Sequence, residues 1–272
     1  MTTGRPTPQE RARLDAIKRQ WQQKRKITDH MGKIRHKIAV YSGKGGVGKT
    51  TVSVNMAVTL ARQGAAAGIL DADIDCPNVV RAMQGKGQPN YTDGEFTPAE
   101  EWGVKVLSMA YFQENEDQAV IFRGPMIHNS LTQFLEGTDW GEMDYLVTDM
   151  PPGTSDAALT IMQTMPLDGF VVVVAPQELA VLDSRRSISM IRKMNMPVLG
   201  VVENFSGDMF GTGAGEAVAQ ENGVPFLGCL QLRADYRDTS KPTALLSGAV
   251  RDEYEAVVAG LKASLESVAA AS

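Results

Sequence analysis

One glycine-rich stretch of this sequence has the residue types and spacing needed to bind a chain of phosphates. The stretch runs from Gly43 to Thr50, reads Gly-Lys-Gly-Gly-Val-Gly-Lys-Thr, and follows the apolar run Ile38–Tyr41. It matches the pattern G-x-x-x-x-G-K-S/T, whose glycines leave no side chain in the way, so that successive N–H groups can point at a phosphate. In this pattern Lys49 reaches the β- and γ-phosphates, and the Thr50 hydroxyl is a Mg²⁺ ligand. The sequence therefore predicts a site for a nucleotide and its magnesium ion.

A helix is predicted directly after this stretch. Residues Thr51–Arg62 place the apolar side chains of Val52, Met56 and Leu60 on one face, and Gly64 provides a stop signal. The first turn of such a helix carries free N–H groups and the positive end of the helix dipole. We expect this helix end to face the phosphates.

Acidic residues follow two apolar runs that are predicted to be buried strands. Asp71, Asp73 and Asp75 come after Ala67–Leu70, and Asp149 ends the second run. A buried aspartate beside a phosphate site is well placed to hold Mg²⁺ or its water molecules, so we assign this role to Asp149. Asp73 is expected to orient the attacking water molecule, and Asp71 to support the metal through its ligands. Capping and solvation are the alternative for Asp71 and the expected role of Asp75.

The segment after Asp149 is predicted to respond to the phosphates. It reads Met-Pro-Pro-Gly-Thr, and its glycine, Gly153, lets the backbone come close to a γ-phosphate. Gly153 and Thr154 are therefore expected to form a switch that senses hydrolysis.

The order of the predicted elements indicates an α/β fold. From Ile38 onward apolar strands alternate with helical segments, which is typical of a mostly parallel sheet with helices on both faces. The run Val171–Val174 is entirely apolar, as expected for a strand that is covered on both sides. Ligands of such sheets bind at the carboxyl ends of the strands, where the glycine-rich stretch and Asp149 are placed.

Composition limits the kinds of protein that this chain can be. Its 272 residues are 43% hydrophobic, yet no apolar run approaches the ~20 residues of a membrane-spanning helix. The N-terminus is polar and has no apolar signal segment, and the two cysteines cannot form a disulfide framework. We therefore expect a cytoplasmic protein. The three histidines, His30, His36 and His128, show no metal-site spacing and are expected on the polar surface.

The first 37 residues are strongly basic, and the remainder is acidic. They hold eleven Lys and Arg against three Asp and Glu, a net charge of +8, and the remainder therefore carries −13. A helix is predicted from Pro8 to about Lys26, with Leu14, Ile17 and Trp21 as a narrow apolar stripe. Such a helix could touch a membrane surface, nucleic acid or an acidic partner. The stripe is short, so we expect instead that Trp21 packs the helix onto the acidic body.

A second lysine narrows the type of nucleotide site. Lys44 follows the first glycine, and the resulting run resembles the deviant Walker A motif of the MinD/ParA-like ATPases. This resemblance implies a homodimer that sandwiches two nucleotides, with Lys44 reaching the phosphates of the partner copy. A further cation there suits phosphoryl transfer, since charge develops on the γ-phosphate oxygens.

Further stretches resemble the Mrp family, a group of MinD-like ATPases that carry iron–sulfur clusters to other proteins. The similar stretches are Phe122–Met126, Trp140–Asp156, Ala175–Leu179 and Pro197–Ser206, within a resemblance that covers residues 8–242. The charge distribution sets apart a basic N-terminal helical extension over residues 1–36, and the resemblance implies a MinD/ParA-like P-loop ATPase domain over residues 37–272.

The resemblance also implies roles for particular residues. Lys44, Lys49 and Asp73 are the expected catalytic residues, and Thr50 and Asp149 the expected Mg²⁺ site. Asn204 matches the residue that usually recognises adenine, because an amide offers both a donor and an acceptor. The residues expected to bind ATP are Gly43, Lys44, Gly45, Gly46, Val47, Gly48, Lys49, Thr50, Thr51 and Asn204. The run Leu230–Arg233 departs from the family pattern, so we expect part of the adenine pocket to be altered.

The cysteine pair that binds the cluster in the Mrp family is missing from this sequence. Its two flanking segments, Val202–Ser206 and Phe210–Gly213, are present, but only Gly-Asp-Met lies between them. A 4Fe–4S cluster shared by two copies needs four thiolates. Cys76 and Cys229 could ligate a cluster only together with other ligands, and Cys229 is expected to be a buried thiol in a strand.

Two functions remain open on the sequence alone. The first is a slow, dimer-dependent and Mg²⁺-dependent ATPase of the Mrp type in iron–sulfur cluster or other metallocofactor assembly, whose partners are a client apoprotein or an assembly factor. The alternative is a nucleotide-switched positioning or partner-binding ATPase of the MinD/ParA type without a cluster, such as a scaffold that grips a protein partner. Membrane and nucleic acid are the less favoured partners.

Overall fold

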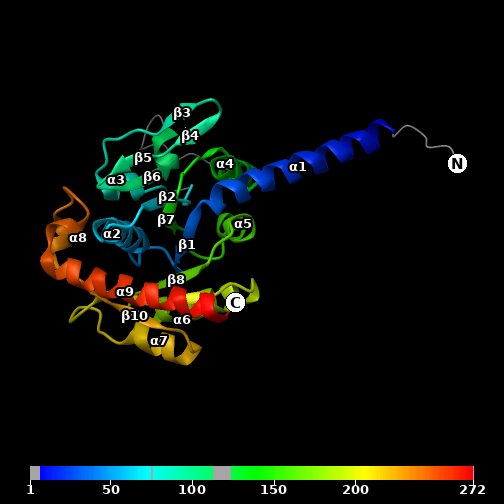
Figure 1. The fold of residues 1–272 in the computed structure, drawn as a ribbon. Coiled ribbons are helices and arrows are strands. Elements are labelled where there is room, and N and C mark those ends of the chain that lie inside the picture. Colours follow the sequence, from blue (N-terminus) through cyan, green and yellow to red (C-terminus); the bar gives the residue numbers. More distant parts are fainter. Residues whose placement is uncertain (1–6, 75, 113–123, 272) are drawn as a thin grey trace.

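An eight-stranded sheet forms the centre of the protein in this computed structural model, which describes residues 7–74, 76–112 and 124–271 (Figure 1). The strand order is β10-β9-β8-β1-β7-β2-β6-β5, and every neighbouring pair is parallel except β5 with β6. The strands are β1 Ile34–Tyr41, β2 Ala67–Asp71, β5 Ala99–Glu101, β6 Val104–Ser108, β7 Met143–Asp149, β8 Gly169–Val174, β9 Val198–Ser206 and β10 Phe226–Gln231. A separate hairpin joins β3 (Asn90–Thr92) to β4 (Glu95–Thr97).

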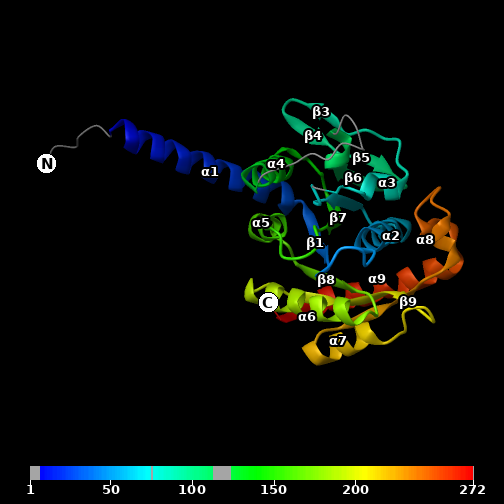
Figure 2. The same cartoon turned by 180° about the vertical axis from the view of Figure 1, so that it is seen from behind.

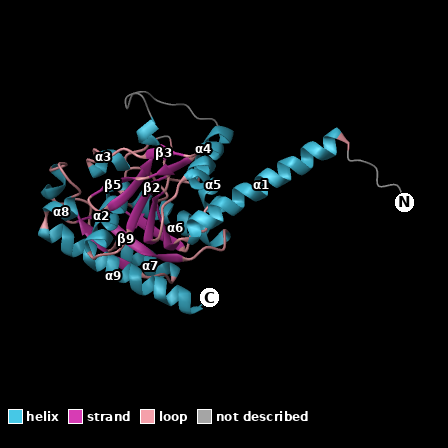
Figure 3. Cartoon of the chain, turned by 45° about the horizontal axis from the view of Figure 1, so that its top comes forward, coloured by secondary structure: helices cyan, strands magenta, loops and turns pink. Residues whose placement is uncertain are grey.

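Helices cover both faces of the sheet, and Figure 3 shows the strands in magenta enclosed by them. The α-helices are α1 Pro8–Gly32, α2 Lys49–Arg62, α3 Val79–Met83, α4 Gly124–Gly137, α5 Asp156–Thr164, α6 Glu178–Lys193, α7 Ala214–Asn222, α8 Thr243–Leu246 and α9 Gly248–Ala271. Short 3₁₀ turns are η1 (Met109–Phe112) and η2 (Ala234–Arg237). Side chains of α2 and α9 build the core on one face, and side chains of α4, α5 and α7 build the core on the other.

Strand β8 shows why the central strands are apolar along their whole length. Val171 and Val173 lie in the core with α2 and α9, whereas Phe170 and Val172 lie in the opposite core. Alternate residues of a strand point to opposite faces, so a strand covered on both sides needs apolar residues at every position. The predicted α/β fold with a mostly parallel sheet is thus confirmed.

Among the described side chains of α1, those that pack on the body lie toward its C-terminal end. Ile27 and Met31 are buried, and the Gln23 side chain donates to Glu136 Oε2 of α4 at 3.0 Å. The rest of the helix points away from the body in every view (Figures 1 and 2). Trp21 is 73% exposed, so the expectation that Trp21 packs the helix onto the acidic body is wrong. The cause is geometric: α1 runs unbroken to Gly32 and leads into β1, with no joint at which it could fold back.

Two further observations concern the surface. His30, expected on the polar surface, is buried at the base of α1, with Nε2 at 3.8 Å from Glu95 Oε1. Within the part of the chain that the structure describes, no helix is both long and apolar enough to cross a bilayer.

Candidate functional site

The glycine-rich loop lies between the end of β1 and the start of α2 at Lys49. Gly46 and Gly48 have φ angles of 84° and 81°, a left-handed conformation that favours glycine. A Cβ atom on Gly48 would lie 2.2 Å from Asn204 Nδ2 and 2.9 Å from Phe205 Cζ. The loop therefore owes its shape both to backbone freedom and to close packing against the end of β9.

Asp149 is the centre of a buried polar cluster at the start of α2. Lys49 Nζ lies 2.7 Å from its Oδ1, and the Thr50 hydroxyl donates to its Oδ2 at 2.7 Å. The Ser53 hydroxyl also donates to Oδ1 at 2.7 Å. Asp149 is 1% exposed and Lys49 is 7% exposed, so the lysine supplies the cation that a buried carboxylate requires. The structure brings the three residues Lys49, Thr50 and Asp149 together, as their predicted roles require.

Ser53 was not predicted from the sequence. It lies one helical turn after Lys49, which places both side chains on the same face of α2. This spacing is the only sign in the sequence that Ser53 contacts Asp149. The contact can be recognised only once the strand register places β7 beside that face of α2.

Asp71 lies next to Asp149, because the two residues are paired in the register of β2 and β7. Its carboxylate accepts hydrogen bonds from Val79 N at 3.1 Å and from the Ser108 hydroxyl at 2.9 Å. Burial and the neighbouring charge of Asp149 together raise the pKa of Asp71 to about 7. Asp71 thus lies behind Asp149, where it was expected to support the metal, and its hydrogen bonds fix the start of α3.

This raised pKa predicts that the free protein loses stability as the pH rises through a defined window. The unfolded chain releases the Asp71 proton near pH 4, whereas the folded chain keeps it until about pH 7. Between these values the folded state binds more protons, so the free energy of unfolding falls with increasing pH and levels off above pH 7. Denaturant unfolding without nucleotide, at steps from pH 5 to about 8, measures this slope.

The Asp71→Asn variant should show a much flatter slope over the same range, because the titrating group is gone. Asp252→Asn, on the exposed side of α9, removes the same formal charge and should keep the wild-type slope. Equal slopes for wild type and Asp71→Asn would contradict the assignment.

A cavity of about 550 Å³ lies over the glycine-rich loop. Its lining includes Lys44, Lys49, Thr50, Asp73, Cys76 and Pro152. Asp73 is half-buried, and its carboxylate accepts a hydrogen bond from Cys76 N at 3.2 Å. The predicted catalytic residues Lys44, Lys49 and Asp73 thus share one cavity. Asp75 lies outside the described residues. So does part of the segment Phe122–Met126, which resembles the Mrp family.

The expected switch segment is tied to the end of β1. Gly153 N donates to Ser42 O at 3.0 Å, and the Tyr41 hydroxyl donates to Gly153 O. Pro152 and Ser155, rather than Gly153 and Thr154, line the cavity. Gly153 has a φ of 71°, so the turn at the switch requires the glycine.

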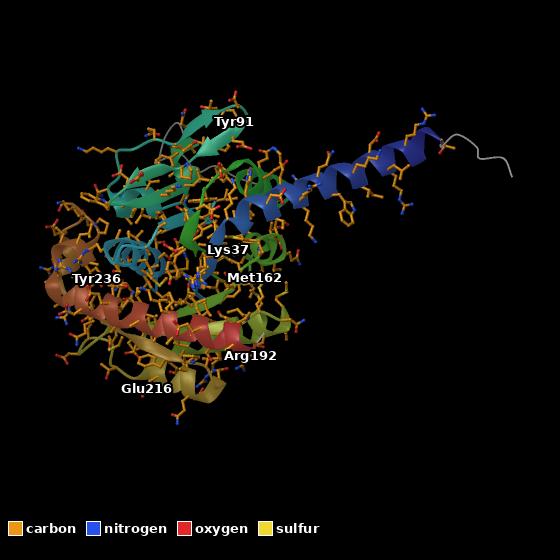
Figure 4. The ribbon with its side chains drawn as sticks, in the orientation of Figure 1. Lys37, Tyr91, Met162, Arg192, Glu216 and Tyr236 are labelled. Carbon is orange, nitrogen blue, oxygen red and sulfur yellow. The ribbon has the colours of Figure 1, made fainter. Side chains whose placement is uncertain are left out.

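A second cavity, of about 460 Å³, continues from the first and shares Thr50 and Thr51 with it. Asn204 and Tyr236 line it, together with Lys241 (Tyr236 is labelled in Figure 4). Asn204 is buried, and its side-chain amide donates to Val47 O at 2.8 Å. Asn204, which is predicted to recognise adenine, therefore also supports the glycine-rich loop. Tyr236 and Lys241 were not predicted, because they follow the run in which the sequence departs from the family pattern.

The two cysteines lie in different surroundings. Cys76 is exposed at the phosphate cavity, and Cys229 lies on the edge strand β10, beside Glu203 of β9 in the register. The Cys229 side chain is exposed, so the expectation of a buried thiol is wrong: β10 has a neighbour on one side only. Partial burial and the charges of Glu203 and Glu253 raise the pKa of this thiol. No group of three or more His, Cys, Asp or Glu side chains that could hold a metal ion occurs among the described residues.

Residues 33–262, most of the chain, match the ParA family model described as NUBPL iron-transfer P-loop NTPase. The chain belongs to this family. Membership of the ParA family confirms the resemblance that the sequence motifs indicated, and it makes the glycine-rich loop the phosphate loop of a P-loop NTPase.

Relatives of known name agree with the ParA family assignment. An iron–sulfur cluster carrier protein of Methanocaldococcus jannaschii is 42% identical over 253 residues, which cover 87% of each chain. A protein of the same name from Synechocystis sp. is 44% identical and covers 76% of this chain and 63% of its own length. The segment shared with this chain therefore makes up most of the Methanocaldococcus jannaschii protein and a smaller part of the Synechocystis protein.

Solved structures agree as well. A nucleotide-binding protein from Archaeoglobus fulgidus, in complex with ADP, is 33% identical with a TM-score of 0.70 over 81% of this chain and 91% of its own. The septum site-determining protein MinD of Pyrococcus horikoshii, complexed with Mg-ADP, is 21% identical with a TM-score of 0.63 over 83% and 94% of the two chains. This second likeness concerns the fold alone.

Proposed function

We propose that this chain is a Mg²⁺-dependent ATPase that acts in the assembly or transfer of iron–sulfur clusters or of another metallocofactor. The observation that carries the ATPase part is the cluster of Lys49, Thr50 and Asp149 at the phosphate loop of a P-loop NTPase. The cofactor part rests on relatives that are named iron–sulfur cluster carrier proteins.

The oxygen donors at the start of α2 suit a magnesium ion. The Asp149 carboxylate already accommodates one cation, the Lys49 ammonium group, at 2.7 Å, and the Thr50 hydroxyl lies beside it. Oxygen ligands of this kind are those that Mg²⁺ takes in nucleotide sites, where the ion neutralises charge on the β- and γ-phosphates. Lys49 then turns from Asp149 toward the phosphates, while Ser53 keeps its hydrogen bond to the carboxylate.

Asp73 and Lys44 complete the reaction in this proposal. Asp73 accepts a proton from, or orients, the attacking water molecule from its place in the phosphate cavity. Lys44 is exposed and enters the site of a second copy, so that turnover is slow in the monomer and needs the dimer.

Mixing two inactive variants tests whether Lys44 acts across the dimer. Lys44→Ala and Asp73→Ala should each hydrolyse ATP poorly, because each lacks one group at every site. A mixed dimer has one site with Lys49, Asp73 and the lysine of the other copy, so the mixture should regain part of the wild-type turnover. No recovery on mixing would contradict action across the dimer.

The cargo of this protein is not held by a cysteine pair of the family type. Where the pair would lie, between Ser206 and Phe210, the chain presents Met209, which is 76% exposed. This exposed apolar residue favours the second candidate function, a nucleotide-switched ATPase that binds a protein partner without a cluster.

Anaerobic reconstitution with iron and sulfide, followed by iron, sulfide and absorbance analysis, separates the two functions. A stoichiometric cluster that is lost in Cys229→Ser or Cys76→Ser supports the carrier function. ATP hydrolysis by a protein that binds no iron would support the second function, a partner-binding ATPase without a cluster.

A further inference from the structure

We name the outer part of α1 (residues 8–22) the arm; within the described part of the chain, its apolar stripe joins neither hydrophobic core. Leu14, Ile17 and Trp21 are all exposed and lie at the spacing of one helix face. At 1.5 Å per residue, Leu14 lies about 25 Å along the helix from the buried Met31. Figure 4 shows the side chains of this part surrounding the helix, with no other segment beside them.

The arm cannot reach the acidic surface of its own chain. No glycine or proline occurs between Gln9 and Met31, so the sequence provides no point at which the helix bends. The arm itself holds four Lys and Arg against two Asp and Glu, a net charge of +2, and any attraction between the arm and the acidic remainder must therefore act between molecules.

A surface with complementary features lies at the base of α1, and we name it the acidic rim. It consists of Asp93, Glu95, Asp139 and Glu142. Lys33 Nζ donates to Asp139 Oδ1 at 3.0 Å, and this hydrogen bond, with the charges of Asp139, Glu142 and Glu95, raises the pKa of Lys33. The β4 strand and Asp139 are joined directly, since Asp139 N donates to Phe96 O at 3.1 Å. Asp93 is exposed in the turn of the β3–β4 hairpin.

The acidic rim also offers an apolar contact. Tyr91 of β3 is 62% exposed, and its ring lies 4.7 Å from that of Phe96 (Tyr91 is labelled at the top of Figure 4). An exposed aromatic side chain among carboxylates matches a helix whose exposed stripe ends in Trp21 and whose flanks carry Arg13 and Lys18.

We infer that the arm of one copy docks on the acidic rim of a second copy, and that the second arm docks on the first rim in return. Such an exchange is isologous, so every favourable contact is made twice. It is separate from the nucleotide sandwich of the proposed function, because it uses neither the phosphate loop nor Lys44. Acidic residues at positions 10 and 15 make the arm less suited to an anionic membrane or to nucleic acid than to a protein surface of mixed character.

Sedimentation of the full-length protein without nucleotide tests the exchange. Wild type should be a dimer at about 0.05 M salt and dissociate toward monomer at about 0.5 M, because salt screens the exposed charges. Arg13→Glu/Lys18→Glu should weaken the dimer at least ~10-fold, and so should Asp93→Lys/Glu142→Lys, since each pair places like charges together. Leu182→Ser, an exposed leucine on α6, should dimerise like wild type.

Mixing the two charge-reversed variants gives the decisive comparison. An equimolar mixture of the two charge-reversed variants should form a heterodimer, because both of its contacts pair opposite charges. A monomeric wild type at low salt, or no recovery in the mixture, would overturn the inference. Binding of wild type to vesicles of phosphatidylglycerol or to duplex DNA, lost in Arg13→Glu/Lys18→Glu without any change in self-association, would also overturn it.

ATP turnover of the arm variants keeps this test separate from the proposed function. Turnover at saturating protein should match wild type, because the arm contributes no residue to the phosphate cavity. A failure of the exchange would therefore leave the ATPase assignment intact, and a failure of the ATPase assignment would leave the nucleotide-free dimer intact.

Discussion

Replacing Lys49 by alanine is expected to reduce ATP turnover by roughly 10²- to 10³-fold, the usual cost of removing one charged donor from a transition state. In the proposed function Lys49 is the phosphate-binding lysine of the loop, and its ammonium group lies 2.7 Å from Asp149 Oδ1 in the buried polar cluster. The measurement is steady-state release of phosphate at saturating ATP and Mg²⁺, together with the affinity of a fluorescent ATP analogue.

The same substitution also removes the only buried cation that contacts Asp149 among the described residues, so loss of folding must be excluded. Removing one partner of a buried ion pair costs about 3–5 kcal/mol. Lys49→Ala/Asp149→Asn relieves this cost, because the amide carries no charge. Because Asp149 is itself an expected Mg²⁺ ligand, this double variant is a control for folding only. Loss of turnover in a Lys49→Ala protein whose unfolding transition is intact shows that Lys49 is needed for the reaction. Wild-type turnover in Lys49→Ala would remove the phosphate loop from the mechanism.

The Gly48→Ala substitution should also have a large effect on stability. A left-handed φ costs an alanine about 1–2 kcal/mol. The added methyl group would also overlap Asn204 Nδ2 at 2.2 Å and Phe205 Cζ at 2.9 Å, and overpacking of this kind costs about 1–3 kcal/mol more. Asn204 cannot move away freely, since its amide is bonded to Val47 O. ATP affinity should fall as well, because the clash distorts the loop that binds the phosphates.

Gly64→Ala provides the matched control. Gly64 has a φ of 86°, close to that of Gly48, but an added Cβ would meet no atom within 4 Å. Denaturant unfolding should therefore show only the backbone cost for Gly64→Ala, with ATP affinity unchanged. Equal losses of stability in the two variants would show that the packing of Asn204 and Phe205 against the loop contributes nothing.

In the arm exchange that we propose, the two copies are already together before nucleotide binds. A dimer held by the arms persists without nucleotide, so the two phosphate loops stay near each other at low protein concentration. Nucleotide then has only to close a pair that is already assembled, which removes much of the entropic cost of association.

The accuracy of the sequence-based predictions depended on how local each feature is. The α2 helix and the buried strands were predicted because the spacing and number of their apolar residues can be read from consecutive positions in the sequence. The short strands β3, β4 and β5 were missed, since three-residue strands carry too little pattern. The position of Trp21 was predicted wrongly because a stripe on a helix does not say which molecule covers it.

The sequence by itself determined the phosphate loop and the α/β order, because both depend on residues that are neighbours along the chain. Only the tertiary structure placed Ser53 and Asp71 against Asp149, Asn204 under Gly48 and Cys229 at an exposed edge. Those contacts join residues up to 157 positions apart, as for Asn204 and Val47. They follow from the register and order of the strands, which a single sequence does not specify.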